Sequence, residues 1–134
     1  MTSRADTLLA QLNQRILILD GAMGSLIQSY KLTEEDFRGD LFADHPCNLS
    51  GNNDVLVLTQ PQVIKEIHKK YLDAGADIIE TNSFNATSIS QADYQLESAV
   101  YDINKAAASL ARQACDEAEK ESSGIPRFVA GTLG

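Results

Sequence analysis

The sequence predicts an α/β fold built on a parallel sheet, because short apolar runs alternate with segments of helical pattern. The predicted strands are residues 16–19, 77–79 and 128–130, which are apolar except for Asp77, and turn residues bound each of them. The segments between the runs are long enough for the crossover connections that parallel strands require. The predicted order is therefore strand, helix, strand, helix, strand.

The first part of the chain predicts one buried strand flanked by short helices. Residues 6–14 place their leucines on one side, as a short helix does. Residues 16–19 are all apolar, which is typical of a strand buried on both faces of a parallel sheet. Residues 22–30 have a helical pattern and follow the glycine of a turn.

The middle of the chain is irregular in pattern. Thr33 and Asp36 predict one capped helical turn. Residues 47–54 are rich in turn-forming side chains, and a loop of this length usually has a function or covers something. Residues 55–58 are ambiguous: a strand is one option, although Pro61 fits the first turn of a helix that follows closely.

Two helices are predicted in the second half of the chain. The first spans residues 62–74 and has Gly75 as its C-terminal cap. The second begins at Ser88, which forms a capping-box pattern with Gln91, and continues to about Lys120. A break at residues 122–126 then precedes the third apolar run.

Composition and charge argue against several classes of protein. The chain has 134 residues, with Lys+Arg 11 against Asp+Glu 19, and a formal net charge of -8. Nucleic-acid binders and proteins on anionic lipid need basic surfaces, so neither partner is expected. No apolar run approaches the roughly 18 residues of a membrane span, and residues 1–14 lack a secretory signal. Two cysteines make no disulfide framework, so we expect a reducing, cytoplasmic location.

The candidate site lies at the predicted strand ends, because ligands of parallel α/β proteins bind at the carboxyl ends of strands. Gly21 and Gly24 tolerate positive φ and allow a backbone to approach a ligand closely, and the free N–H groups of the next helix favour a carboxylate. Asp20 adds an acceptor for a cationic group. Together these features suit the zwitterionic end of an amino acid. The alternative is an ordinary strand-to-helix turn in which Asp20 caps the helix.

Glu80 ends the second predicted strand and shares a face with Ile78, as Asp20 shares a face with Ile18. If these faces are equivalent, both acids look into the same opening. The alternative is that each acid is solvated or caps a helix. Small residues, 131–134, also follow the third strand.

Other chemistry has weaker support. His45 and Cys47 lie two positions apart, but no second pair of ligands follows at zinc-site spacing. We expect His68 to be a partly buried helix residue and Cys115 a small packed one. No Ser-His-Asp set or cysteine nucleophile is indicated.

Three motifs together resemble the homocysteine methyltransferase family. They are Leu-Asp-Gly-Ala-Met-Gly-Ser at residues 19–25, Asp-Ala-Gly-Ala-Asp-Ile-Ile-Glu-Thr-Asn-Ser-Phe at 73–84, and Phe-Val-Ala-Gly-Thr-Leu-Gly at 128–134. Residues 36–61, with Phe-Arg-Gly and Gly-Asn-Asn-Asp, resemble the cobalamin-dependent methionine synthases within it. Ser25 and Ser83 stand where the family commonly has Thr, and both keep the hydroxyl group.

The resemblance implies a (β/α)₈ TIM barrel, which needs eight strands and roughly 250 residues. Residues 1–134 are then a partial homocysteine-binding domain: the N-terminal portion of the barrel, with about three parallel strands and truncated after the third. The implied substrate-binding residues are Asp20, Gly21, Ala22, Met23, Gly24, Ser25, Glu80, Thr81, Asn82 and Ser83.

The implied reaction transfers a methyl group from methylcobalamin, recharged by 5-methyltetrahydrofolate, to a zinc-bound homocysteine thiolate and yields methionine. The family's three zinc cysteines match no position here and are expected beyond Gly134, so no metal ligand or catalytic residue is expected within the chain, and this segment alone should be inactive. The implied partners are homocysteine and the folate, cobalamin and activation domains of the same polypeptide.

Two other functions remain as alternatives. A homocysteine methyltransferase that uses betaine or S-methylmethionine would share the glycine and Glu-Thr-Asn signals, but residues 36–61 speak against it. A small, complete α/β module would bind an anion or a nucleotide without catalysis.

Overall fold

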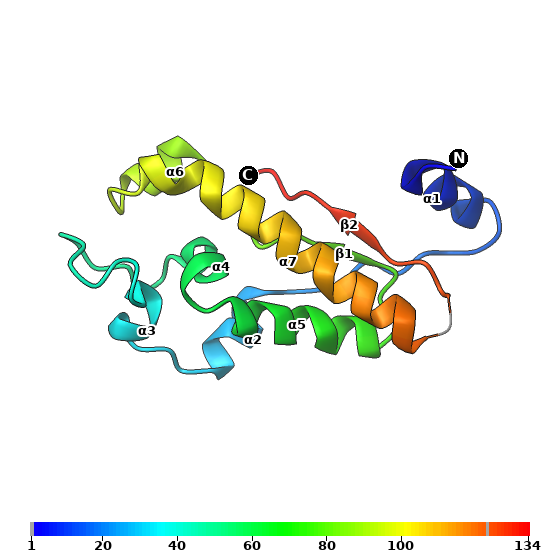
Figure 1. The fold of residues 1–134 in the computed structure, drawn as a ribbon, viewed down its shortest axis with the longest axis horizontal. Helices are drawn as coiled ribbons and strands as arrows, with labels where there is room; N and C mark the ends of the chain where they lie inside the picture. Colours follow the sequence, from blue (N-terminus) through cyan, green and yellow to red (C-terminus); the bar gives the residue numbers. More distant parts are fainter. Residues whose placement is uncertain (1, 123) are drawn as a thin grey trace.

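The computed structural model describes residues 2–122 and 124–134 and shows a small parallel sheet covered by two helices (Figure 1). Strands β1 (Ile78–Glu80) and β2 (Phe128–Ala130) are parallel neighbours, and Ile79 pairs with Val129. Both were predicted, with their boundaries shifted by at most one residue. The α/β class is therefore confirmed, while a closed barrel is not seen in the described residues.

The first predicted strand, residues 16–19, is wrong as a regular element. Only Leu19 bridges β1, opposite Ile78. Ladder bonds between parallel strands recur at every second residue, so the next donors would be the N–H groups of Ile18 and Glu80. Both donate to aspartate side chains instead, Ile18 to Asp77 and Glu80 to Asp20. Side-chain carboxylates thus replace backbone acceptors at both ends of this contact.

The predicted burial of this segment on both faces is also wrong. The exposed fractions of Ile16, Ile18 and Leu19 are 84, 55 and 51%. The helices that cover the sheet pack on the side of Ile79, which is fully buried. The apolar side chains of residues 16–19 therefore lie outside both core clusters.

Helices α5 (Pro61–Asp73) and α7 (Val100–Glu121) lie side by side over the sheet (Figure 1). Two ion pairs join them, Lys65 with Glu117 and Lys69 with Glu121. Pro61 is in the first turn of α5 as predicted. The positive φ of 109° at Gly75, just beyond the C-terminal cap, explains the glycine there. The buried aliphatic and small side chains of these elements belong to two core clusters. One contains Ile64, Ile67, Ile103 and Ala107, and the other contains Leu72, Ile79, Ala111, Ala114 and Cys115.

The predicted helix from Ser88 to Lys120 is in fact interrupted. The chain forms α6 (Ser88–Ala92), a 3₁₀ turn η2 (Glu97–Ala99) and then α7. The N-cap of α6 is Thr87, and Gln91 does not close a capping box because its buried amide pairs with Asn52 at 2.8 and 3.1 Å. Gln95 has a φ of 54°, which no helix accommodates.

Short helices make up much of the described chain before α5. Helices α1 (Arg4–Leu12), α2 (Gly24–Ser29) and α3 (Glu34–Arg38) were all predicted, although α1 lies two residues earlier and α2 begins two residues later than expected. The capping box of Thr33 and Asp36 is confirmed. Residues 55–58, which were ambiguous, are helical: η1 (Asn53–Val55) runs into α4 (Leu56–Thr59).

Polar side chains hold the loop between α3 and η1. The guanidinium of Arg38 pairs with Glu34 at 2.8 Å and donates to the carbonyls of His45 and Cys47 at 2.7 and 3.0 Å. Glu34 also accepts the N–H groups of Leu49 and Ser50, and these bonds keep its pKa below the usual value despite its burial. This long loop is therefore an ordered element.

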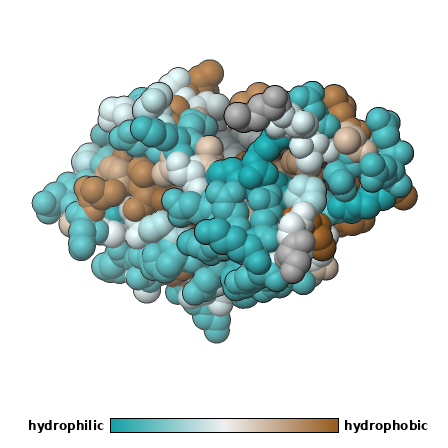
Figure 2. All heavy atoms as spheres, turned by 45° about the vertical axis from the view of Figure 1, so that its right-hand side comes forward, coloured by the Kyte–Doolittle hydropathy of each residue, from teal (hydrophilic) through white to brown (hydrophobic). Residues whose placement is uncertain are grey.

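Hydrophobic atoms form separate groups within a hydrophilic surface on the face that Figure 2 shows. Of the helices in the described part of the chain, none is long and apolar enough to cross a membrane.

Candidate functional site

A cavity of about 360 Å³ opens at the C-terminal ends of β1 and of segment 16–19. Eight of the ten predicted site residues line it, and these come from residues 20–23 and 80–83. Gly24 and Ser25 do not line it, because they form the first turn of α2. Phe84 and Thr132 complete the lining. The sequence motifs thus meet in one place, as their strand-end positions predict.

Asp20 lies at the inner wall of this cavity. Its Oδ2 atom accepts the N–H of Glu80 at 3.1 Å, while Oδ1 is buried and has no partner among the described residues. Burial raises the pKa of Asp20 to about 6; the hydrogen bond from Glu80 opposes the rise, and the carboxylate of Glu80 adds to it. A buried carboxyl oxygen without a partner is costly, so this position favours a bound proton or a cation.

The prediction that both acids open into one cavity is confirmed, but the argument behind it was wrong. Paired residues of parallel strands point to the same side, and Leu19, not Asp20, is paired with Ile78. Asp20 reaches Glu80 because it lies beyond the bridge, where its side chain takes the place of a ladder acceptor.

Hydroxyl groups join the ends of β1 and β2. The Oγ atoms of Thr81 and Ser83 are 2.7 Å apart, and Ser83 also donates to the carbonyl of Thr132. The N–H of Thr132 donates to Thr81, and its hydroxyl donates to Glu80 at 3.2 Å. Thr132 was not among the predicted site residues, although its place after a strand in a Gly-Thr-Leu-Gly run carried the same signal as the other loops.

Gly21 serves close packing. A Cβ atom at this position would lie 3.2 Å from the hydroxyl of Tyr71, which donates to the carbonyl of Ala22 at 2.6 Å. Neither Gly21 nor Gly24 has a positive φ, so the tolerance of glycine for left-handed backbone is not used at either position. Asp20 is not the N-cap of α2 either, because that position is occupied by Met23.

The 3₁₀ turn η1 braces the segment after β1. The side-chain amide of Asn82 donates to the carbonyl of Asn53 at 2.9 Å, and the N–H of Asn85 donates to Asp54 at 3.0 Å. Asp54 is buried, and burial raises its pKa. Sequence reasoning missed this brace, because nothing in the spacing of residues 52–54 and 82–85 relates the two segments.

The described residues do not make a zinc site. No group of three His, Cys, Asp or Glu side chains in this part of the structure could hold a metal ion. His45 Nε2 and Cys47 Sγ both contact the carbonyl of Tyr94, at 2.6 and 3.0 Å, away from the cavity.

The two remaining candidates are core residues. Cys115 is buried, as expected, and burial raises the pKa of its thiol to about 11. His68 is fully rather than partly buried, and burial lowers its pKa to about 4.

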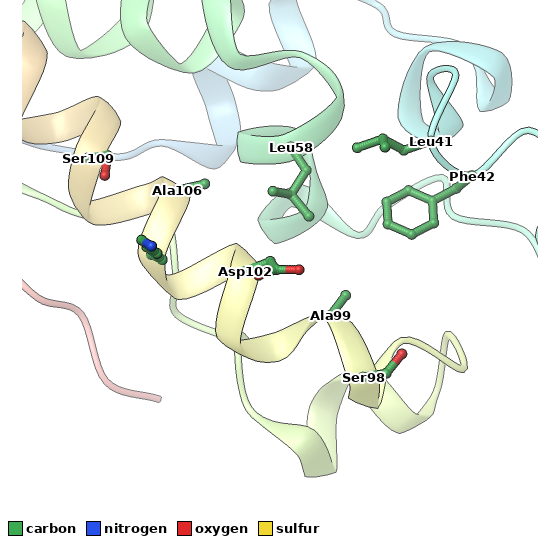
Figure 3. A pocket seen from close by; sticks show the side chains of 9 residues that line it. Leu41, Phe42, Leu58, Ser98, Ala99, Asp102, Ala106 and Ser109 are labelled. Carbon is green, nitrogen blue, oxygen red and sulfur yellow. The ribbon is translucent and has the colours of Figure 1, made fainter.

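A larger hollow, of about 610 Å³, lies between α4, α7 and the loop after α3 (Figure 3). Leu41 and Phe42 face Leu58 across it, and Asp102 and Ala106 of α7 form another part of its wall. It contains none of the predicted residues. The smaller cavity at the strand ends, in contrast, brings together the predicted residues of two separate sequence motifs, so it is the candidate functional site.

The chain is similar to known proteins over nearly all of its length. The family model of homocysteine S-methyltransferases matches residues 17–134. The oxidized form of the homocysteine methyltransferase MmuM from Escherichia coli superposes with a TM-score of 0.74 at 28% identity over 95% of this chain. Its metallated form gives a TM-score of 0.71 at 26% identity over 93% of this chain. In both comparisons the chain spans 40% of the length of the MmuM chain.

Proposed function

The chain belongs to the homocysteine S-methyltransferase family, and from this premise we propose that its strand-end cavity holds the amino-acid end of homocysteine during methyl transfer to the sulfur. The observation that carries the proposal is the convergence of residues 20–23 and 80–83 on one cavity. These two segments are far apart in the sequence and belong to separate motifs.

The chemistry of the lining suits an α-amino acid. Asp20 and Glu80 supply two carboxyl groups for an ammonium group, and Asp20 has a buried oxygen free to accept a hydrogen bond. The amide group of Asn82 has two N–H bonds and uses one for the carbonyl of Asn53, so the other can donate to a carboxylate. The hydroxyls of Thr81, Ser83 and Thr132 donate to one another's residues and to Glu80, which fixes the shape of this wall of the cavity. The side chains of Met23 and Phe84 add apolar surface for the methylene groups.

In this proposal the residues of the chain bind and orient the substrate. Asp20 and Glu80 hold the ammonium group and thereby fix the direction in which the thiol points, which is a proximity effect. Neither acts as an acid or base on the sulfur. A metal supplies a thiolate when it binds a thiol, but the described residues offer no such site, so the role proposed for them ends at the amino-acid group.

The finer proposal is that the methyl donor is methylcobalamin, recharged by 5-methyltetrahydrofolate, as in methionine synthase. Its support is the resemblance of residues 36–61, which form the ordered loop and helices from α3 to α4. A donor such as S-methylmethionine or betaine is the competing assignment, because the family and MmuM are named for transfer to homocysteine without a stated donor.

Two measurements on the full-length protein test these proposals. Methionine formation from homocysteine is measured with methylcobalamin, S-methylmethionine and betaine in turn, and activity with only one of the latter two would refute the cobalamin assignment. The variant Asp20→Ala should raise KM for homocysteine by about tenfold to a hundredfold, since a charge-assisted hydrogen bond contributes about 1.5–3 kcal/mol. Unchanged KM and kcat would exclude Asp20 from the site.

A further inference from the structure

The charges that line the cavity do not balance. Its described lining contains two carboxyl groups, Asp20 and Glu80, and no Lys, Arg or His. The other titratable neighbour is Tyr71 of α5, whose hydroxyl donates to the carbonyl of Ala22. The lining residues that precede α2, apart from Asp20, and the one that follows β2 carry no titratable side chain. Nothing in the described lining neutralises a second negative charge.

The geometry divides the two acids into different roles. Glu80 accepts a hydrogen bond from Thr132 and is half-buried. Asp20 uses one oxygen to accept the N–H of Glu80, and its other oxygen is buried with no described partner. An acceptor in this position gains a partner when the carboxyl group is protonated or when a cationic donor enters the cavity. Of the two acids, Asp20 is therefore the one whose charge depends on what the cavity contains.

We infer that Asp20 exchanges a proton for the ammonium group of the amino acid, so that substrate binding releases a proton on the acid side of neutrality. The inference rests on the proposed binding of homocysteine at this site. In the free protein at acid pH, the proton sits on the Asp20 carboxyl group. When the ammonium group enters, Asp20 donates that proton to solvent, its carboxylate forms a charge-assisted hydrogen bond with the ammonium, and no other bond changes.

The raised pKa of Asp20, about 6, sets the range in which the exchange is visible. About half of the molecules carry the proton at pH 6 and almost none at pH 8, so binding should release about half a proton at the first pH and nearly none at the second. The apparent affinity should fall about twofold from pH 8 to pH 6 and about tenfold by pH 5.

Calorimetric titration of the full-length protein with methionine tests the inference. The thioether of methionine has no proton to lose, and its ammonium group stays charged over this range, so a released proton comes from the protein. Titrations at about pH 6 and about pH 8, each in two buffers of different ionisation enthalpy, give the number of protons released. The deamino analogue of methionine, which lacks the ammonium group, should release none.

Two variants assign the proton. Asp20→Asn should abolish the release, because an amide has the same shape and no proton to exchange. Asp54→Asn is the matched control: Asp54 is also buried with a raised pKa, but it faces Asn85 outside this cavity, so the release should persist.

The outcomes separate the inference from the proposed function. Methionine binding without pH-dependent proton release, or release that survives in Asp20→Asn, overturns the inference and leaves the site assignment in place. If neither methionine nor homocysteine binds, both are overturned.

Discussion

Asp20 and Asp77 hold the two ends of the contact between residues 16–20 and β1, and they do so in opposite electrostatic surroundings. Each carboxylate accepts a backbone N–H that a regular ladder would have paired. Asp77 also forms a two-pronged ion pair with Arg15 at 2.8 and 3.1 Å. Asp20 has no cationic partner among the described residues, and its second oxygen is unpaired.

The difference in pKa follows from these surroundings. The hydrogen bonds of Asp77 with Arg15 and Ile18 outweigh its burial and hold its pKa below the usual value. Burial of Asp20 is only partly offset, so its pKa is raised to about 6. In barrels built of β/α units, the N-terminal ends of strands generally serve stability and the C-terminal ends serve ligands. The contact between residues 16–20 and β1 has the paired Asp77 at one end and the unpaired Asp20 at the other.

The largest expected effect comes from removing Asp77, the carboxylate whose two oxygens both have partners. Asp77→Ala should lower the free energy of unfolding by about 2 kcal/mol, because Arg15 and the N–H of Ile18 lose their partner. Urea unfolding measures this difference. Asp73→Ala is the control, since Asp73 is more than half exposed and its ion pair with Lys69 contributes little. Equal losses in the two variants would contradict the assigned role of Asp77.

A smaller effect of opposite sign is expected at Asp20, whose second oxygen has no described partner. Asp20→Asn should raise the free energy of unfolding by about 1 kcal/mol at neutral pH, because it removes a carboxylate that burial disfavours. This change is well below the free energy that the whole pKa shift would represent, because the Asp20 carboxyl group is partly solvated. The same urea experiment measures it, and a clear loss of stability would show that the charge of Asp20 supports the fold.

The pH dependence of the two variants sharpens the comparison. The stabilisation by Asp77 is present above the unfolded pKa of about 4 and is lost as the pH falls through its lower folded pKa. The destabilisation by Asp20 is absent below about pH 4 and develops as the pH rises to its folded pKa of about 6. The loss in Asp77→Ala and the gain in Asp20→Asn should therefore both shrink in acid. Unfolding measured from about pH 3 to 7 tests this; the protonation of buried His68 is common to all the proteins and cancels.

The smallest expected effect concerns the ion pairs that hold α1. The side chain of Arg4 is half exposed and contacts Glu119 at 2.9 Å and Asp116 at 3.5 Å. Arg4→Ala should lower the free energy of unfolding by about 0.5 kcal/mol, and added salt should reduce the difference between variant and parent. A difference that does not respond to salt would mean that the contact acts through packing.

The parts of the fold that were predictable depend on local patterns. Strand β1 follows a helix with a glycine just beyond its cap, and β2 follows a break that contains Pro126, so turn chemistry bounds both. The candidate site was predictable for the same reason, because its residues directly follow the strand ends. The capping box of Thr33 and Asp36 is likewise a matter of neighbours in sequence.

The parts that were not predictable depend on distant partners. Gln91 has the spacing of a capping residue, yet its amide is buried against Asn52, 39 positions away, and the long helix is interrupted there. The segment 16–19 has the composition of a buried strand, but carboxylates of Asp20 and Asp77 end its ladder. The pairings of Gln91 with Asn52, of Ile18 with Asp77 and of Glu80 with Asp20 join residues far apart in the sequence, so no local pattern shows them.

The single bridge between Leu19 and Ile78 has a consequence for the motion of the cavity wall. Local opening costs less where fewer backbone bonds must break, so residues 16–20 should separate from β1 more readily than β2 does. A ligand held by Asp20 and Glu80 would fasten these two segments together from inside the cavity. Binding would then slow amide hydrogen exchange at Asp20 and Glu80 more than in the helices, and the protein would gain rigidity where the ligand sits.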